Sequence, residues 1–145
     1  MDDGPWKGNG ETILIAEDEP ALRRLLASAL VDLGYEVVIT QDGEEAARAF
    51  EASAGGVRLA ILDVVMPRLG GIQAYARMRT IAPRLKVVFT TGYAPEYAQL
   101  DEIVAEGGHA VLSKPFSLDE LGRVIREVLD YTEPSSRRAP ASAGA

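Results

Sequence analysis

Acidic and phosphate-binding residue types stand at the ends of four short apolar runs in this sequence. Glu17 and Asp18 follow the first run, Asp63 follows the second, and Thr91 and Lys114 follow the next two. If each run is a buried strand of a parallel sheet, residues at the carboxyl ends of the strands converge on one crevice. We therefore expect three carboxylates, a hydroxyl and an ammonium group to share a single pocket.

These groups suit metal-dependent phosphoryl chemistry. Carboxylates packed this closely repel one another unless a cation lies among them, and Mg²⁺ prefers hard oxygen ligands. Because Mg²⁺ keeps several waters, Asp18 and Asp63 are predicted to bind it directly and Glu17 through water, with the backbone carbonyl of Val65 as a further ligand. A carboxylate at the end of a buried strand can attack phosphorus. Asp63 is the candidate nucleophile.

The incoming phosphoryl group needs local donors, and the sequence offers three. Lys114 precedes Pro115, which restricts the backbone and could direct the ammonium group inward, towards a phosphoryl oxygen. Thr91 supplies a hydroxyl, and Gly92 leaves its backbone N–H open to close approach. Each residue alone has a simpler interpretation, since Glu17 and Asp18 could cap a helix. Their conjunction at four strand ends favours the functional interpretation.

Composition bounds the remaining choices. The chain has 145 residues, 47% of them hydrophobic, a net charge of −7 and no cysteine. These values are typical of one globular domain, exclude disulfides and thiolate metal sites, and argue against direct binding of nucleic acid. The longest apolar runs fall far short of the roughly 20 residues that span a bilayer, and the first residues do not resemble a signal peptide. We expect a cytoplasmic protein that does not contact the membrane.

Strand and helix patterns alternate five times along the chain. Strands are expected at residues 12–16, 35–40, 59–62, 85–90 and 110–112, and helical apolar stripes follow each of them. This order predicts an α/β fold, a doubly wound five-stranded parallel sheet with strand order 2-1-3-4-5. We expect residues 1–10 to form a flexible arm, 11–131 the domain and 132–145 a disordered tail. The sequence leaves open whether Trp6 docks on the domain.

The strings ILIAEDEP, LDVVMPRLGG, VVFTTGY and VLSKPF occur in this order with strand and helix spacing between them. Over about residues 11–131 the chain thereby resembles the receiver domain of two-component response regulators, which has a flavodoxin-like fold. The resemblance implies that Asp63 is the phosphoacceptor and that Glu17 and Asp18 are the acidic Mg²⁺ pair. It further implies that Lys114 is the phosphate-binding lysine, Thr91 the switch hydroxyl, and the bond before the next proline cis.

The resemblance also implies partners. A histidine kinase or a histidine phosphotransfer protein would supply the phosphoryl group, and the domain would catalyse its own phosphorylation and dephosphorylation without being a conventional enzyme. Output would pass to a downstream protein through the face made by the fourth helix, fifth strand and fifth helix. The sequence leaves open a stand-alone receiver, the receiver end of a hybrid kinase, and a homodimer.

Two departures from the family pattern stand out. Val111 occupies the switch position where members usually carry Tyr or Phe, so the switch is expected to be altered. Val65 and Tyr93 occupy the variable positions that tune access of hydrolytic water in the family. An apolar and a bulky group there lead us to expect a long-lived phosphate on Asp63.

Three other functions compete with this interpretation. A phosphatase of the haloacid dehalogenase type needs an Asp two residues after its nucleophile, where Val65 stands. Flavin binding is disfavoured because Glu17, Asp18 and Glu19 would repel the flavin phosphate. An interaction module that binds its partners without phosphorylation stays open because of Val111. His109, the only histidine, is assigned no role.

Overall fold

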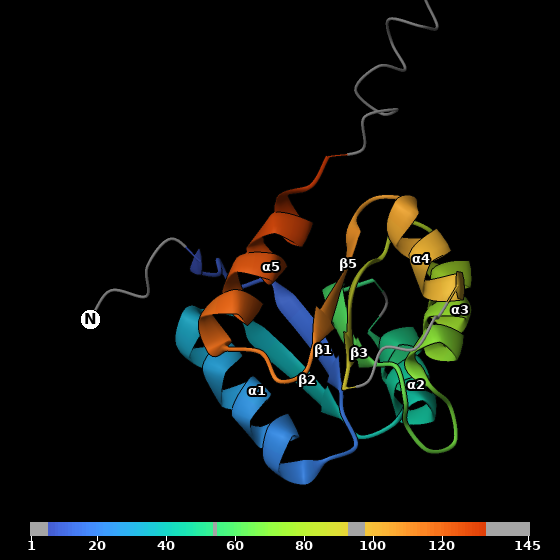
Figure 1. Cartoon of the computed structure of the whole chain (residues 1–145), viewed down its shortest axis with the longest axis horizontal. Helices are drawn as coiled ribbons and strands as arrows, with labels where there is room; N and C mark the ends of the chain where they lie inside the picture. The colour runs from blue at the N-terminus through green and yellow to red at the C-terminus, as the bar shows by residue number, and fades with distance from the viewer. Residues whose placement is uncertain (1–5, 54, 93–97, 133–145) are drawn as a thin grey trace, which may run out of the picture.

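The computed structural model describes residues 6–53, 55–92 and 98–132, which fold as five successive strand and helix pairs (Figure 1). The strands are β1 Thr12–Ala16, β2 Glu36–Thr40, β3 Val57–Asp63, β4 Lys86–Thr91 and β5 His109–Ser113. The helices are α1 Pro20–Leu33, α2 Gly43–Ala52, α3 Gly71–Ile81, α4 Ala98–Ala105 and α5 Leu118–Asp130. All ten predicted elements are therefore present, and the ends of the strands differ from the expected ones by at most two residues.

The five strands form one parallel sheet in the order β2-β1-β3-β4-β5, which confirms the predicted topology. Helices α1 and α5 cover one face, and α2, α3 and α4 cover the other (Figure 1). The central strands β1 and β3 are almost entirely buried because side chains on both of their faces pack under helices. Because all five strands are parallel, their carboxyl ends lie at the same edge of the sheet.

Residues typical of helix ends make the contacts expected of them. Pro20 opens α1, and Gly34 ends it with φ 104°, donating its N–H to the carbonyls of the last turn. Asp42 and Ser117 cap α2 and α5 by accepting a backbone N–H from the residue three positions later. No helix within the described ranges is long and apolar enough to cross a membrane.

Residues 6–10, the described part of the segment that we expected to be a flexible arm over residues 1–10, contact the domain. Gly8 donates its N–H to the carbonyl of Leu33 at 2.7 Å, and Gly10 donates to that of Gly34 at 2.9 Å. Trp6 packs beside Gly122 of α5, where an added Cβ would lie 3.3 Å from the Cβ of Trp6. The part of this segment that the structure describes thus contacts the domain, because the glycines let the backbone approach the end of α1 closely. Residues 1–5 and 133–145 lie outside the described ranges.

Candidate functional site

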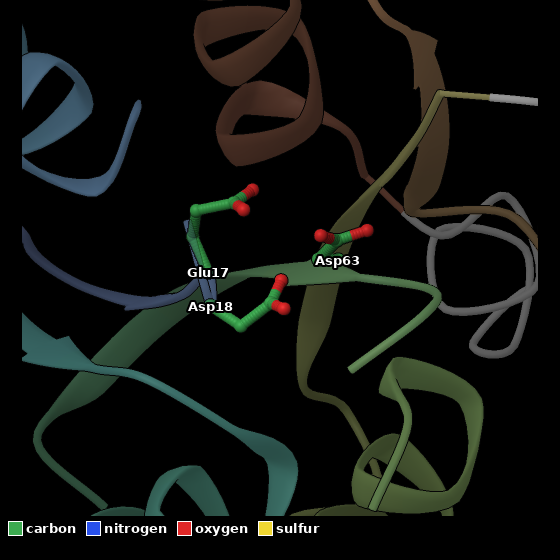
Figure 2. Close-up of side chains that lie close together, drawn as sticks. All are labelled: Glu17, Asp18 and Asp63. Carbon is green, nitrogen blue, oxygen red and sulfur yellow. The ribbon is translucent and has the colours of Figure 1, made fainter. Parts of the chain in front are cut away.

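The predicted site residues meet at the carboxyl edge of the sheet. Glu17 and Asp18 follow β1, and Asp63 is the last residue of β3 (Figure 2). Thr91 is the last residue of β4, and Lys114 directly follows β5. The sheet order places β1, β3, β4 and β5 side by side, so residues almost 100 positions apart in sequence face one pocket.

Three carboxylates form the acidic part of this pocket. Figure 2 shows Glu17, Asp18 and Asp63 converging from β1 and β3, and one oxygen from each lies within 4.8 Å of the others. Glu17 and Asp63 are buried, with 1% and 5% of their surface exposed, whereas Asp18 is exposed. Among the described residues this cluster is the one group of three acidic or metal-ligating residues close enough to hold a metal ion.

Lys114 lies between the two buried carboxylates. Its Nζ donates to Oε1 of Glu17 at 3.0 Å and to Oδ2 of Asp63 at 3.1 Å. The peptide bond between Lys114 and Pro115 is cis, as the resemblance implied. Because the side chain of Lys114 is 23% exposed, its ammonium group is still within reach of an incoming anion.

The second oxygen of Glu17 is also occupied. Its Oε2 accepts the backbone N–H of Glu19, the residue that precedes α1, at 3.0 Å. Arg23 of α1 donates from Nη1 to the backbone carbonyl of Glu17 at 2.8 Å. Glu19 is itself the N-cap residue of α1, and no side chain among the described residues caps the N–H groups of the first turn, so the helix-capping interpretation of Glu17 and Asp18 is wrong. Glu17 instead binds Lys114 with one oxygen and the N–H of Glu19 with the other. Sequence reasoning did not identify Arg23, because no local pattern relates an arginine to the carbonyl six residues earlier.

The electrostatics of Asp63 follow from this crowding. Burial and the neighbouring negative charge of Glu17 raise the pKa of Asp63 to about 6, against the lowering effect of Lys114. Burial acts to lower the pKa of Lys114, but its bonds to Glu17 and Asp63 outweigh burial and raise it. One ammonium group is thus too little positive charge for this pocket. The donor set of hard carboxylate oxygens with a deficit of positive charge fits Mg²⁺.

The loop between β3 and α3 lies beside the carboxylate of Asp63. Val65 points its backbone N–H at Oδ1 of Asp63 across 3.4 Å, and its own side chain is 66% exposed. Val64 donates its N–H to the carbonyl of Thr90 at 2.9 Å, which ties the loop to β4. The backbone of Val65 is therefore near the acidic cluster, as its predicted role as a carbonyl ligand requires.

The predicted phosphoryl donors lie on β4 and after it. Thr91 is buried, and its carbonyl accepts the N–H of Lys114 at 2.8 Å, so these two strand ends are joined. Gly92 is exposed, and a Cβ added there would lie 3.7 Å from the side chain of Lys114. Tyr93 lies outside the described residues. Val111 lies on β5 opposite Phe89 and is 39% exposed.

His109 has surroundings that suit a structural role. Val87 donates its N–H to Nδ1 of His109 at 3.2 Å, and the ring of Tyr75 lies edge-on with centroids 5.3 Å apart. The side chain of His109 is only 6% exposed and lies at the amino end of β5, away from the acidic cluster. This placement agrees with our assigning it no part in the site.

Comparisons with known proteins match this architecture. Residues 13–126 match the sequence family described as the response regulator receiver domain. The chain is 36% identical over 119 residues to sensor kinase CckA of Brucella abortus, covering 82% of this chain but 12% of that protein. It is also 36% identical over 117 residues to the response regulator receiver protein CpdR of Brucella abortus, covering 81% of this chain and 95% of that protein.

A solved structure gives the same result. The crystal structure of the receiver domain from the hybrid histidine kinase CckA superposes with a TM-score of 0.70 at 33% identity, covering 82% of this chain and 99% of that one. The family match takes in β1 to most of α5, and the fold and strand order agree with it. The chain therefore belongs to the family of response regulator receiver domains.

Proposed function

We propose that this domain takes a phosphoryl group onto Asp63 in a Mg²⁺-dependent reaction and signals by protein contact. The observation that carries the proposal is the double contact of Lys114 with Glu17 and Asp63 inside an acidic cluster. A buried carboxylate with a purely structural role would need only one cation or hydrogen-bond donor beside it. This pocket instead gathers three carboxylates and a lysine at an edge of the sheet that solvent can reach. Such an arrangement suits a site that exchanges cations and anions.

The donor would be a phosphohistidine on a histidine kinase or a histidine phosphotransfer protein. One carboxylate oxygen of Asp63 forms a bond to phosphorus while the bond from phosphorus to the imidazole nitrogen breaks, and the nitrogen keeps the electron pair. The product is an acyl phosphate on Asp63 and a free histidine. Lys114, the hydroxyl of Thr91 and the backbone N–H of Gly92 would bind the phosphoryl oxygens.

Asp18 and Asp63, the backbone carbonyl of Val65 and, through water, Glu17 would hold the metal. The bound cation would offset the negative charge of the carboxylates and of the phosphoryl oxygens. Support for this assignment comes from the acidic cluster itself. A response regulator protein of 30% identity and TM-score 0.71, TrrA from Thermotoga maritima, was crystallised in complex with Mg(2+)-BeF.

We infer a cytoplasmic location, where a kinase of this type would present its phosphohistidine.

A small-molecule phosphodonor tests the proposal without a partner protein. The full chain is incubated with acetyl phosphate and Mg²⁺, and its intact mass is measured. We expect the parent to gain one phosphoryl group, and we expect no gain with a chelator present or in Asp63→Asn. A gain in both the parent and the variant would place the acceptor elsewhere and refute the assignment.

Output through the face made by α4, β5 and α5 is part of the same proposal. Val111 favours one alternative, an interaction module that works without phosphorylation, because no aromatic ring stands at this position of β5 to follow the hydroxyl of Thr91. The two functions differ in a single measurement. If acetyl phosphate labels Asp63 but leaves the amide NMR signals of α4, β5 and α5 unchanged, the alternative is favoured.

The lifetime of the phosphate is a second part of the proposal. The side chain of Val65 is exposed beside Asp63 and offers no group that could position water for attack on phosphorus. We expect the acyl phosphate to be long-lived, and we expect Val65→Asn to shorten its half-life. Decay of the phosphorylated mass after removal of acetyl phosphate measures both. Equal decay of parent and variant would contradict this role.

A further inference from the structure

The loop after Asp63 contains a backbone conformation that is costly for its residue. Arg68 has φ 66°, and it is the one non-glycine residue with positive φ within residues 6–53, 55–92 and 98–132. A residue with a Cβ loses about 1 kcal/mol or more in this conformation, whereas glycine adopts it freely. The arginine side chain must therefore contribute something that glycine would lack.

That side chain binds the residue that opens α2. Nε and Nη2 of Arg68 both donate to Oδ2 of Asp42, at 2.9 and 2.5 Å. The other oxygen of Asp42 accepts the backbone N–H of Glu45 at 2.8 Å. The side chain of Asp42 is 5% exposed and that of Arg68 is 65% exposed, so one buried carboxylate joins the helix cap to the loop.

A backbone contact lies directly beside this ion pair. Gly43 donates its N–H to the carbonyl of Leu69 at 3.0 Å, and a Cβ on Gly43 would overlap that oxygen. At its other end the loop is closed by Gly71, which donates to the carbonyl of Val64 at 3.1 Å. Residues 64–70 are thus held at β4, at α3 and, through Arg68, at the turn between β2 and α2.

We propose that Arg68 and Asp42 form a positioning pair that holds the loop so that the backbone of Val65 stays beside Asp63, and thereby sets the affinity for the divalent cation. This inference rests on the proposed function, because it concerns the same site. Neither residue touches the acidic cluster. The pair acts on the cluster through the backbone between Arg68 and Val65, which carries the N–H near Oδ1 of Asp63.

Arg68→Gly separates positioning from stability. The variant loses an ion pair between an exposed arginine and a buried carboxylate, but Asp42 keeps the backbone N–H of Glu45, so we expect a cost of about 1 to 2 kcal/mol, which relief of the positive φ largely offsets. We expect its free energy of unfolding to change little. We expect calorimetry on the full chain to show Mg²⁺ affinity weakened by about tenfold, the lower end of the effect of groups that orient metal ligands.

Two further variants sharpen the test. Asp42→Asn keeps an oxygen that can cap α2 but loses the charge facing Arg68, so it is expected to weaken Mg²⁺ binding similarly. The double variant is expected to bind Mg²⁺ no more weakly than the weaker-binding single variant, because the two substitutions remove the same ion pair. Arg77→Gln removes the neighbouring ion pair with Glu44, 2.9 Å long, without touching the loop, and serves as the matched control. Its Mg²⁺ affinity is expected to equal that of the parent.

Hydrogen exchange of residues 64–70 without metal completes the experiment. We expect faster exchange in Arg68→Gly than in the parent and in Arg77→Gln. Unchanged Mg²⁺ affinity and unchanged exchange in Arg68→Gly would overturn the inference while leaving the proposed function intact. If the parent itself bound no Mg²⁺ and gained no phosphoryl group, the proposed function would fail, and the exchange data would still report whether the pair orders the loop.

Discussion

Lys114 and Glu17 are 97 residues apart in sequence, yet Nζ of the lysine lies 3.0 Å from Oε1 of the glutamate. The same Nζ lies 3.1 Å from Oδ2 of Asp63. Two buried carboxylates therefore share one cation. The stability of the metal-free protein and its readiness for an incoming anion both depend on this shared contact.

Removing the lysine is expected to destabilise the metal-free protein. Lys114→Met leaves Glu17 and Asp63 buried without their cation, and we expect a loss of about 2 kcal/mol in the free energy of unfolding, measured with urea. Added Mg²⁺ should restore most of that loss. Arg24→Met, which removes an exposed cation from α1, is the control and should change little. A Lys114→Met variant as stable as the parent in chelator would contradict the shared contact.

Removing the charge of Asp63 is expected to stabilise the metal-free protein. Its pKa is raised from 3.8 to about 6, so the folded protein holds this proton more tightly than the unfolded chain does. The contribution of Asp63 to the free energy of unfolding therefore falls as the pH rises from about 3.8 to about 6, and it stays low at higher pH. With a chelator present, the free energy of unfolding of Asp63→Asn should be higher than that of the parent by about 1 to 2 kcal/mol at about pH 7.5. The difference should shrink at about pH 4.5, and an equal difference at both pH values would refute the explanation.

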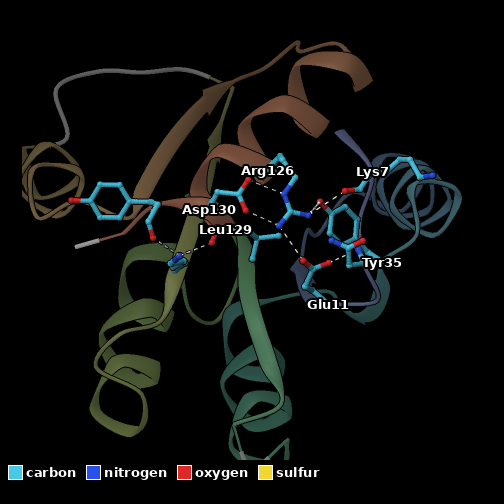
Figure 3. Close-up of polar contacts among 9 residues, drawn as sticks. Lys7, Glu11, Tyr35, Arg126, Leu129 and Asp130 are labelled. Carbon is cyan, nitrogen blue, oxygen red and sulfur yellow. Dashed lines mark hydrogen bonds and ion pairs between the residues drawn. The ribbon is translucent and has the colours of Figure 1, made fainter. Parts of the chain in front are cut away.

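The N-terminal segment is expected to contribute to stability through Arg126. The guanidinium of Arg126 on α5 donates to Oε2 of Glu11 at 3.1 Å, to the carbonyl of Lys7 at 3.2 Å and to the hydroxyl of Tyr35 at 3.4 Å. Figure 3 shows these contacts of α5 with the N-terminal segment and Tyr35. Arg126 also binds Asp130 on its own helix. The side chains of Arg126 and Glu11 are 17% and 12% exposed, so this ion pair is shielded from solvent.

We therefore expect Arg126→Met to lower the free energy of unfolding by about 1 to 3 kcal/mol. The fluorescence of Trp6, the only tryptophan, should shift to longer wavelength as the segment loosens. Arg123→Met, three residues earlier on α5, breaks an exposed pair with Glu127 and should cost less than about 1 kcal/mol. Equal losses of unfolding free energy in Arg126→Met and Arg123→Met would show that the N-terminal segment contributes nothing to stability.

The turn before β5 offers a test of close packing. Gly107 has φ 89°, and a Cβ there would overlap the hydroxyl of Tyr131 at the end of α5. Gly55 has φ 86° with no atom within 4 Å of such a Cβ. Gly55→Ala should therefore lower the free energy of unfolding only by the backbone strain, about 1 kcal/mol, and Gly107→Ala should lower it by about 1 to 3 kcal/mol more. Thermal unfolding of both variants measures the difference, and equal costs would mean that Tyr131 moves aside freely.

The fold and the centre of the site were predictable because they follow from short-range patterns. Apolar runs indicated the strands, and Asp63 follows its strand directly. Parallel topology then brought the strand ends together, so a linear pattern predicted a three-dimensional cluster.

The supporting contacts were not predictable, because they join side chains that share no period. The Arg68 pair with Asp42 spans 26 residues, and the contact of Arg126 with the carbonyl of Lys7 spans 119. The glycines near the N-terminus indicated a loose arm, whereas they allow close backbone contacts with Leu33 and Gly34. Such contacts depend on tertiary geometry rather than on local propensity.

The most direct test of the central claim is to locate the phosphoryl group. Chain treated with acetyl phosphate and Mg²⁺ is reduced with borohydride, which converts an aspartyl phosphate into homoserine, and its peptides are sequenced by mass spectrometry. We predict homoserine at position 63 in the parent and at no position in Asp63→Asn. A phosphoryl group found on any other residue, or a parent chain that stays unmodified, would contradict the account.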